Sequence, residues 1–254
     1  MTLGYHTIGQ GPEKLLFLHG WLSDHLLFEG LFPLLDGDRY TAVFADYRGY
    51  GLSSAQKGDY TIDEIAGDMI DLLGELGWQS SHIIGHSMGG MVVQKIAKLR
   101  PDLVISGVAV TPVPASGFEM DADTAAFFQS SAKDDAALEN IFNILTGERH
   151  ADQFLKLMTA SARKATTTEA YLGYLNAWTT TDFSAEVADI ETDILVVAGA
   201  HDGALGPEVM RNTYLKQLKN VNLVTIDGAG HYPTQEAPIE LFTILDKHLK
   251  KYSQ

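Results

Sequence analysis

Short apolar segments alternate along the chain with longer segments whose apolar residues recur at helical spacing. Six of the short segments are rich in Val, Ile, Leu and Phe and are bounded by turn residues, which is typical of buried strands. They are residues 14–18, 40–46, 82–85, 104–110, 194–199 and 222–226. Strands that alternate with helices predict an open, mostly parallel sheet with helices on both faces, a doubly wound α/β fold. Ligands of such sheets bind at the carboxyl ends of the strands.

The segments between the strands carry helix signals. Residues 62–76 form one apolar stripe, preceded by Thr61 with Glu64 three residues later, which is a capping box. Residues 207–218 and 238–249 are predicted as further helices. Each begins with proline, whose missing N–H costs nothing in the first turn of a helix.

One long stretch, residues 116–185, interrupts the alternation. It has no convincing strand, but it has helical stripes at 138–145 and 171–178. Because it lies between the fourth and fifth predicted strands, we expect it to form a helical cap over the carboxyl edge of the sheet. The chain then consists of a core made of residues 1–115 and 186–254, with the cap inserted between them.

Composition narrows the class of protein. The 254 residues are 45% hydrophobic and 20% charged, which predicts one large globular domain or one domain with an insertion. The absence of cysteine excludes disulfides, thiolate nucleophiles and cysteine-based zinc sites. A formal charge of −15 repels nucleic acid and anionic membranes, so we expect neither as a partner. Residues 1–14 carry no basic start followed by an apolar stretch, and no run of ~18 apolar residues occurs, so we expect a cytoplasmic protein.

A nucleophile motif follows the third predicted strand. Residues 85–89 read G-H-S-M-G, which matches G-x-S-x-G, and a helical segment at 91–99 comes next. A sharp strand-to-helix turn lifts the serine hydroxyl clear of the sheet and needs small residues around it. It also places the serine at a helix N-terminus, where negative charge is favoured. Ser87 is therefore the candidate nucleophile.

A serine hydroxyl needs a base, and two later loops supply the candidates. His231 lies in a glycine-flanked loop after the last predicted strand, and Asp202 follows the strand before it. Both loops leave the same edge of the sheet as Ser87. Asp227, at the start of the histidine loop, is the rival carboxylate. Because a residue of that tight loop would tend to point along it rather than beneath the imidazole, we expect Asp202 to be the acid.

Acyl transfer also needs donors for the developing oxyanion. Residues 17–21 end an early strand with a His-Gly turn. The backbone N–H of Trp21 is placed to point at the same site as that of Met88, the residue after the nucleophile. We predict that these two groups form an oxyanion hole.

With these motifs the chain resembles the α/β-hydrolase family, in its small, cap-bearing, esterase-like branch. The matching segments are L-H-G-W at 18–21, D-Y-R-G-Y-G-L-S at 46–53, G-H-S-M-G-G at 85–90, G-A-H-D at 199–202 and G-A-G-H at 228–231. The resemblance implies the α/β-hydrolase fold, with Ser87 as nucleophile, Asp202 as acid and His231 as base. It also implies an oxyanion hole from the backbone of Trp21 and Met88.

Two departures from relatives of this family bear on the reaction. Relatives that open epoxides or remove halide carry Asp at the nucleophile position, where this chain has Ser87. They also carry proline two residues after the Gly of the His-Gly turn, where this chain has Leu22. Both differences favour acyl transfer.

We therefore expect a serine hydrolase that cleaves small to medium, largely apolar carboxylic esters through an acyl-enzyme. A small-molecule ester is the expected partner, and no cofactor or metal is implied. Phe142, Tyr174 and Trp178 are candidate pocket residues, although such stripes also form the core of a cap. The alternatives are a lactonase, an enol-lactonase, a carbon–carbon bond hydrolase, a cofactor-free perhydrolase or haloperoxidase, and a slow-turnover ligand receptor of hydrolase fold.

Overall fold

A computed structural model describes residues 3–253, so residues 1, 2 and 254 of the expected core lie outside the described residues. Seven strands in this part of the chain form one sheet in the order β1-β3-β2-β4-β5-β6-β7. The strands are β1 (Tyr5–Ile8), β2 (Glu13–Leu18), β3 (Tyr40–Ala45), β4 (Ser81–His86), β5 (Val104–Val110), β6 (Ile194–Gly199) and β7 (Val221–Ile226). All pair in parallel except β1, which is antiparallel to β3. The six expected strands are confirmed, with small shifts at their ends.

The edge strand β1 was not expected from the sequence. It has only four residues, of which the two end residues, Tyr5 and Ile8, are half-buried and the middle two are exposed. Such a short segment has neither the continuous apolar run of a buried strand nor a clear alternation. Its position is fixed by backbone pairing, which aligns Tyr5 with Ala45 of β3.

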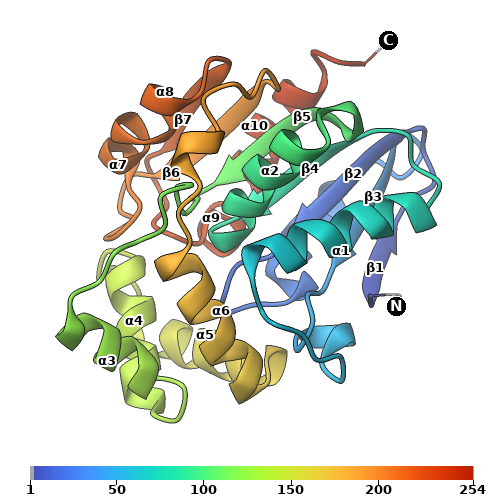
Figure 1. The fold of residues 1–254 in the computed structure, drawn as a ribbon. Helices are drawn as coiled ribbons and strands as arrows, with labels where there is room; N and C mark the ends of the chain where they lie inside the picture. Colours follow the sequence, from blue (N-terminus) through green and yellow to red (C-terminus); the bar gives the residue numbers. More distant parts are fainter. Residues whose placement is uncertain (1–2, 254) are drawn as a thin grey trace.

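Helices cover both faces of the sheet (Figure 1). In Figure 1, α1 (Ile62–Glu75) and α2 (Met88–Leu99) lie in front of the sheet, and α10 (Pro238–Leu249) lies behind it. The remaining core helices are η1 (His25–Leu34), η2 (Gly51–Ser53), η3 (Pro101–Leu103), η4 (Ser184–Glu186), α7 (Pro207–Asn212), α8 (Tyr214–Gln217) and α9 (Pro233–Glu236). This arrangement is the doubly wound α/β architecture that the sequence predicts.

Two helix predictions need correction. Residues 207–218 form two helices, α7 and α8, rather than one. They are separated at Thr213, whose backbone angles, φ −116° and ψ −85°, lie outside the helical region. At α1, the Thr61 hydroxyl accepts from the Glu64 N–H as expected. The Glu64 carboxylate, however, reaches back to the N–H groups of Asp59 and Tyr60 instead of that of Thr61.

Four α-helices lie between β5 and β6: α3 (Ala122–Ser130), α4 (Asp135–Leu145), α5 (Asp152–Ala165) and α6 (Thr168–Thr180). Figure 1 shows them grouped at the end of the sheet where the chain leaves β5. The Trp21 indole N–H, from the loop after β2, donates to the Tyr171 carbonyl of α6 at 2.7 Å. A backbone bridge also joins Tyr50 to Thr166. These contacts dock the helical layer on the loops at the carboxyl edge.

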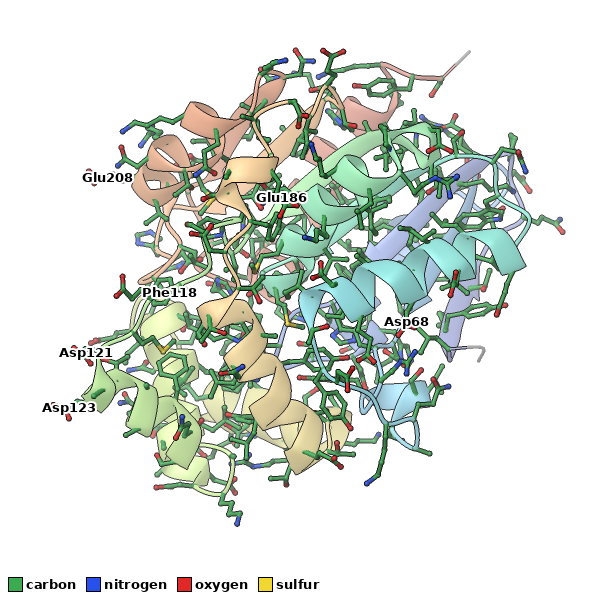
Figure 2. All side chains as sticks on the ribbon, in the orientation of Figure 1. Asp68, Phe118, Asp121, Asp123, Glu186 and Glu208 are labelled. Atoms are coloured by element: carbon green, nitrogen blue, oxygen red, sulfur yellow. The ribbon has the colours of Figure 1, made fainter. Side chains whose placement is uncertain are left out.

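Two acidic residues at the start of α3 face solvent. Asp121 and Asp123 are exposed, and Figure 2 shows both at the outer edge of α3, pointing away from the body of the molecule.

Within residues 3–253, no helix combines the length and apolar character needed to cross a membrane.

Candidate active site

Ser87 occupies a sharp turn between β4 and α2. Its backbone has φ 53° and ψ −117°, a strained conformation for a residue with a side chain. The turn is possible because glycines flank it: a Cβ on Gly85 would come within 2.2 Å of the Gly89 carbonyl oxygen. The Ser87 N–H donates to the Val110 carbonyl at 2.9 Å, which ties the turn to the end of β5.

Three loops bring Ser87, His231 and Asp202 into one hydrogen-bonded chain. The Nε2 atom of His231 lies 3.0 Å from the Ser87 hydroxyl, and its Nδ1 lies 2.7 Å from Oδ2 of Asp202. All three residues are buried. The Oδ1 atom of Asp202 accepts from the N–H groups of Ala204 and Leu205 at 3.0 and 2.9 Å, so this carboxylate is held at both oxygens.

The rival carboxylate, Asp227, lies elsewhere. It is exposed at the first position after β7, whereas Asp202 is buried against the imidazole. His201, next to Asp202, is exposed as well. The geometry therefore joins His231 to the acid that the sequence favours.

The main chain of His231 is itself held by two side chains. Its carbonyl oxygen accepts from His86 Nε2 at 2.8 Å and from the Thr111 hydroxyl at 2.9 Å. Burial, followed by the nearby His231 imidazole, holds the pKa of His86 well below its usual value. His86 therefore stays neutral and serves as a structural donor. Thr111 was not identified from the sequence, since a threonine after a strand carries no distinctive signal.

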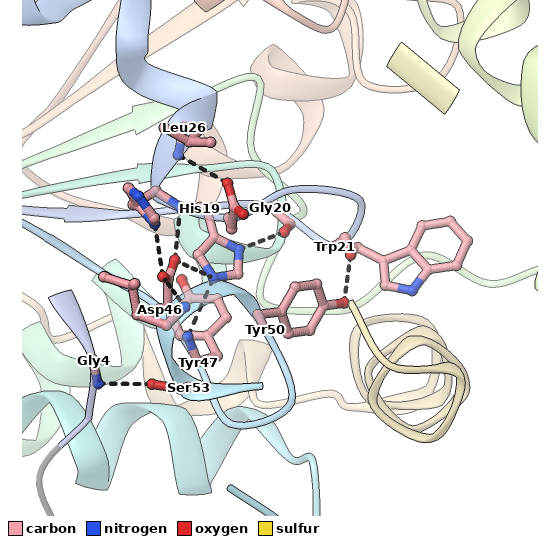
Figure 3. A network of polar contacts seen from close by, with 12 residues as sticks. Gly4, His19, Gly20, Trp21, Leu26, Asp46, Tyr47, Tyr50 and Ser53 are labelled. Carbon is pink, nitrogen blue, oxygen red and sulfur yellow. Dashed lines mark hydrogen bonds and ion pairs between the residues drawn. The ribbon is translucent and has the colours of Figure 1, made fainter. Parts of the chain in front are cut away.

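The loop that carries Trp21 lies against the nucleophile, and Figure 3 shows how His19 and Tyr50 bond to its main chain. A Cβ on Gly20 would come within 2.7 Å of His86 Nδ1 and 3.0 Å of the Ser87 Cβ, so glycine allows this close approach. His19 Nδ1–H donates to the Gly20 carbonyl at 2.8 Å, and the Tyr50 hydroxyl donates to the Trp21 carbonyl. Burial lowers the pKa of His19, which suits this structural role.

Met88, the other residue expected to bind the oxyanion, is the first residue of α2. The first N–H groups of a helix have no partner within the helix, and they carry partial positive charge. The Met88 N–H therefore has no acceptor within the helix, and it directly follows Ser87 in the chain.

A small cavity of about 40 Å³ opens onto Ser87 and His231, with room for only a few water molecules. Its lining is mostly aromatic and aliphatic. The aromatic lining residues are Trp21, Phe118, Phe128, Trp178 and Tyr232. Phe118, which Figure 2 labels, lies on the segment between β5 and α3.

Of the three expected pocket residues, only Trp178 lines this cavity. Phe142 is fully buried and packs on the ring of Tyr232, with ring centres 5.5 Å apart. Tyr174 is also fully buried, with its ring centre 5.5 Å from that of Tyr50. Both side chains belong to the packing between cap and core, so their assignment to the pocket was wrong.

The described residues hold no cluster of three or more His, Asp or Glu side chains arranged to bind a metal ion.

Comparisons with known proteins agree with this architecture. A family model described as alpha/beta hydrolase fold matches residues 14–238. Epoxide hydrolase 1 of Caenorhabditis elegans is 26% identical over 99% of this chain and 68% of that protein. The 2-(acetamidomethylene)succinate hydrolase of Mesorhizobium japonicum is 28% identical over 94% of this chain and 88% of that protein. An esterase structure from Exiguobacterium antarcticum superposes with a TM-score of 0.88 at 19% identity, covering 98% of this chain and 95% of that one.

The site consists of a strained serine, between a parallel strand and a helix, that is bonded through a histidine to an aspartate on later loops. This arrangement is typical of a hydrolase on an α/β fold. The chain belongs to the alpha/beta hydrolase fold family. The relatives support a hydrolase, but they are named for different substrates, an epoxide and 2-(acetamidomethylene)succinate.

Proposed function

We propose that the protein is a serine hydrolase that cleaves small, largely apolar carboxylic esters through an acyl-enzyme. The observation that carries the proposal is the hydrogen-bonded chain from Ser87 through His231 to Asp202, which opens onto a mostly apolar cavity. These are the parts that nucleophilic acyl transfer requires.

In the first half of the reaction, the Ser87 oxygen attacks the ester carbonyl carbon while His231 Nε2 takes the hydroxyl proton. Asp202 holds the imidazole by Nδ1 and stabilises its positive charge. The backbone N–H groups of Trp21 and Met88 donate to the oxyanion. The tetrahedral intermediate then expels the alcohol, which receives the proton from His231, and leaves the acyl group on Ser87.

In the second half, water enters and loses a proton to His231 as its oxygen attacks the acyl carbon. The bond to Ser87 breaks, the serine oxygen regains a proton from His231, and the carboxylic acid leaves. No redox step occurs and no other reactant is needed.

Ester cleavage is preferred to epoxide opening because of the nucleophile. An alkyl-transfer reaction needs a carboxylate that forms an ester with the substrate and is then hydrolysed, and the turn carries Ser87 instead. The likeness to an epoxide hydrolase therefore supports the fold and the loop order rather than the same reaction.

The size of the cavity predicts a preference for short acyl groups. A volume of about 40 Å³ holds only a few atoms beyond the reacting carbonyl. In a panel of p-nitrophenyl esters from C2 to C12, run beside lactones, kcat/KM is expected to be highest for the shortest acyl groups, since longer chains must displace packed aromatic side chains. A higher kcat/KM on lactones would contradict ester specificity. A burst of p-nitrophenol without steady turnover would instead indicate a receptor.

Replacing Trp178 with alanine is expected to widen the cavity and move the preferred acyl chain to a greater length, with a larger change in KM than in kcat. The reason is that Trp178 lines the cavity, whereas the groups that react lie on the core loops. Trp78→Ala is the matched control, because Trp78 lies beyond the end of α1 with Lys14 above its ring and does not line the cavity. The same chain-length profile in both variants and the wild type would show that Trp178 does not select the substrate.

A further inference from the structure

A buried carboxylate accepts hydrogen bonds from the main chain on both sides of His231. Glu236, the last residue of α9, has a side chain with no exposed surface. Its Oε2 accepts from the N–H of Gly230 at 2.9 Å, and its Oε1 accepts from the N–H of Tyr232 at 3.0 Å. These amides belong to the residues directly before and after His231. One side chain therefore fixes the backbone that carries the imidazole.

The partners of this carboxylate come from the cap. Arg149 and His150, in the loop between α4 and α5, approach Glu236 Oε2 at 3.3 and 2.9 Å. Arg149 also donates to the Gly228 carbonyl at 2.9 Å. The His231 N–H itself donates to the Leu145 carbonyl, at the end of α4, at 2.9 Å. The end of α4 and the loop after it are thus bonded to the base loop at several points.

A carboxylate without exposed surface is costly unless it is paired and hydrogen-bonded, and charge-assisted bonds to backbone N–H groups are stronger than neutral ones. Glu236 is both paired and hydrogen-bonded, so its carboxylate holds the loop of His231 rigidly. Proton transfer between Ser87 and His231 depends on a 3.0 Å contact, and a displacement of ~1 Å at such a site costs up to about 100-fold in rate.

We propose that Glu236 is a positioning residue for His231, with Arg149 and His150 of the cap holding its carboxylate in place. The proposal rests on the proposed function, in which His231 is the catalytic base. It gives the cap a part in the chemistry besides covering the cavity: the loop after α4 sets the orientation of the base.

The chain contains a matched control for this arrangement. Glu64 also accepts from two backbone N–H groups, those of Asp59 and Tyr60 at 3.0 and 2.9 Å, and it also pairs with an arginine, Arg48, at 3.4 Å. It lies in the first turn of α1 and touches none of the three residues of the Ser87–His231–Asp202 chain. Glu64→Gln therefore makes the same chemical change in the same kind of contact.

The experiment compares Glu236→Gln with Glu64→Gln on p-nitrophenyl acetate. The carbonyl oxygen of glutamine still accepts, but its NH₂ group cannot, so one of the two backbone N–H groups beside His231 loses its acceptor. Glu236→Gln is expected to lower kcat by about 10-fold to 100-fold at nearly unchanged KM, while Glu64→Gln leaves both constants near the wild type. Equal effects of the two substitutions, or an effect of Glu236→Gln on KM alone, would show that Glu236 is only structural.

Two further measurements keep the test decisive. If Glu236→Gln does not fold, Arg149→Ala is compared with Arg48→Ala, and only the first is expected to lower kcat. Proton NMR of the His231 Nδ1–H, bonded to Asp202, reports the imidazole position without any substrate. This resonance is expected to shift or broaden in Glu236→Gln and to stay in place in Glu64→Gln. An unmoved resonance in both would contradict the proposal, whereas a wild type without ester turnover would contradict only the proposed function.

Discussion

Ser87→Ala is expected to lower kcat on p-nitrophenyl acetate by roughly 10⁴-fold or more, as loss of the nucleophile does in related catalytic sites. The methyl group cannot form the acyl-enzyme, and His231 Nε2 loses the hydroxyl that it contacts at 3.0 Å. Residual turnover then comes from binding and the oxyanion donors alone.

The same substitution is expected to leave the melting temperature nearly unchanged. Alanine keeps the Cβ of serine and therefore the same strain at φ 53°, and the backbone bond to Val110 remains. Ser106→Ala is the matched control, because Ser106 is a buried serine of β5 that contacts His82 and His248 rather than the site. A Ser87→Ala variant that keeps a tenth of the wild-type kcat would overturn the assignment of the nucleophile.

Asp202→Asn is expected to lower kcat by at least about 10³-fold, somewhat less than the loss measured for the equivalent change in a well-studied triad. Its Oδ1 position accepts from two backbone N–H groups, so the asparagine oxygen stays there. The NH₂ group must then face His231 Nδ1. That nitrogen becomes an acceptor, the proton moves to Nε2, and the imidazole can no longer accept the proton of Ser87.

Asp227→Asn is the control for this experiment, and its kcat is expected to stay within about tenfold of the wild type, since an exposed side chain away from the imidazole has no such effect. Steady-state kinetics, with circular dichroism to verify folding, measure both variants. The reverse order of effects would make Asp227 the acid and leave Asp202 with a structural role only.

Six of the seven described strands, and the order of the three loops along the chain, could be predicted from the sequence. The six strands were recognisable because a parallel sheet covered on both faces requires continuous apolar runs, and those runs end in turn residues. The loops of Ser87, Asp202 and His231 could be placed at one edge because parallel strands share their carboxyl end. The turn at Ser87 was recognisable because its glycines are a local steric requirement.

The tertiary structure was needed to establish which side chains of the cap face the cavity and what holds the base loop. Phe142, Tyr174 and Trp178 all lie on apolar stripes, but a stripe does not distinguish packing against the core from lining a pocket. The contacts of Glu236 with Arg149 and His150 join segments 86 or more residues apart. Periodicity and turn chemistry act over a few residues, whereas such contacts exist only after the cap has docked on the sheet.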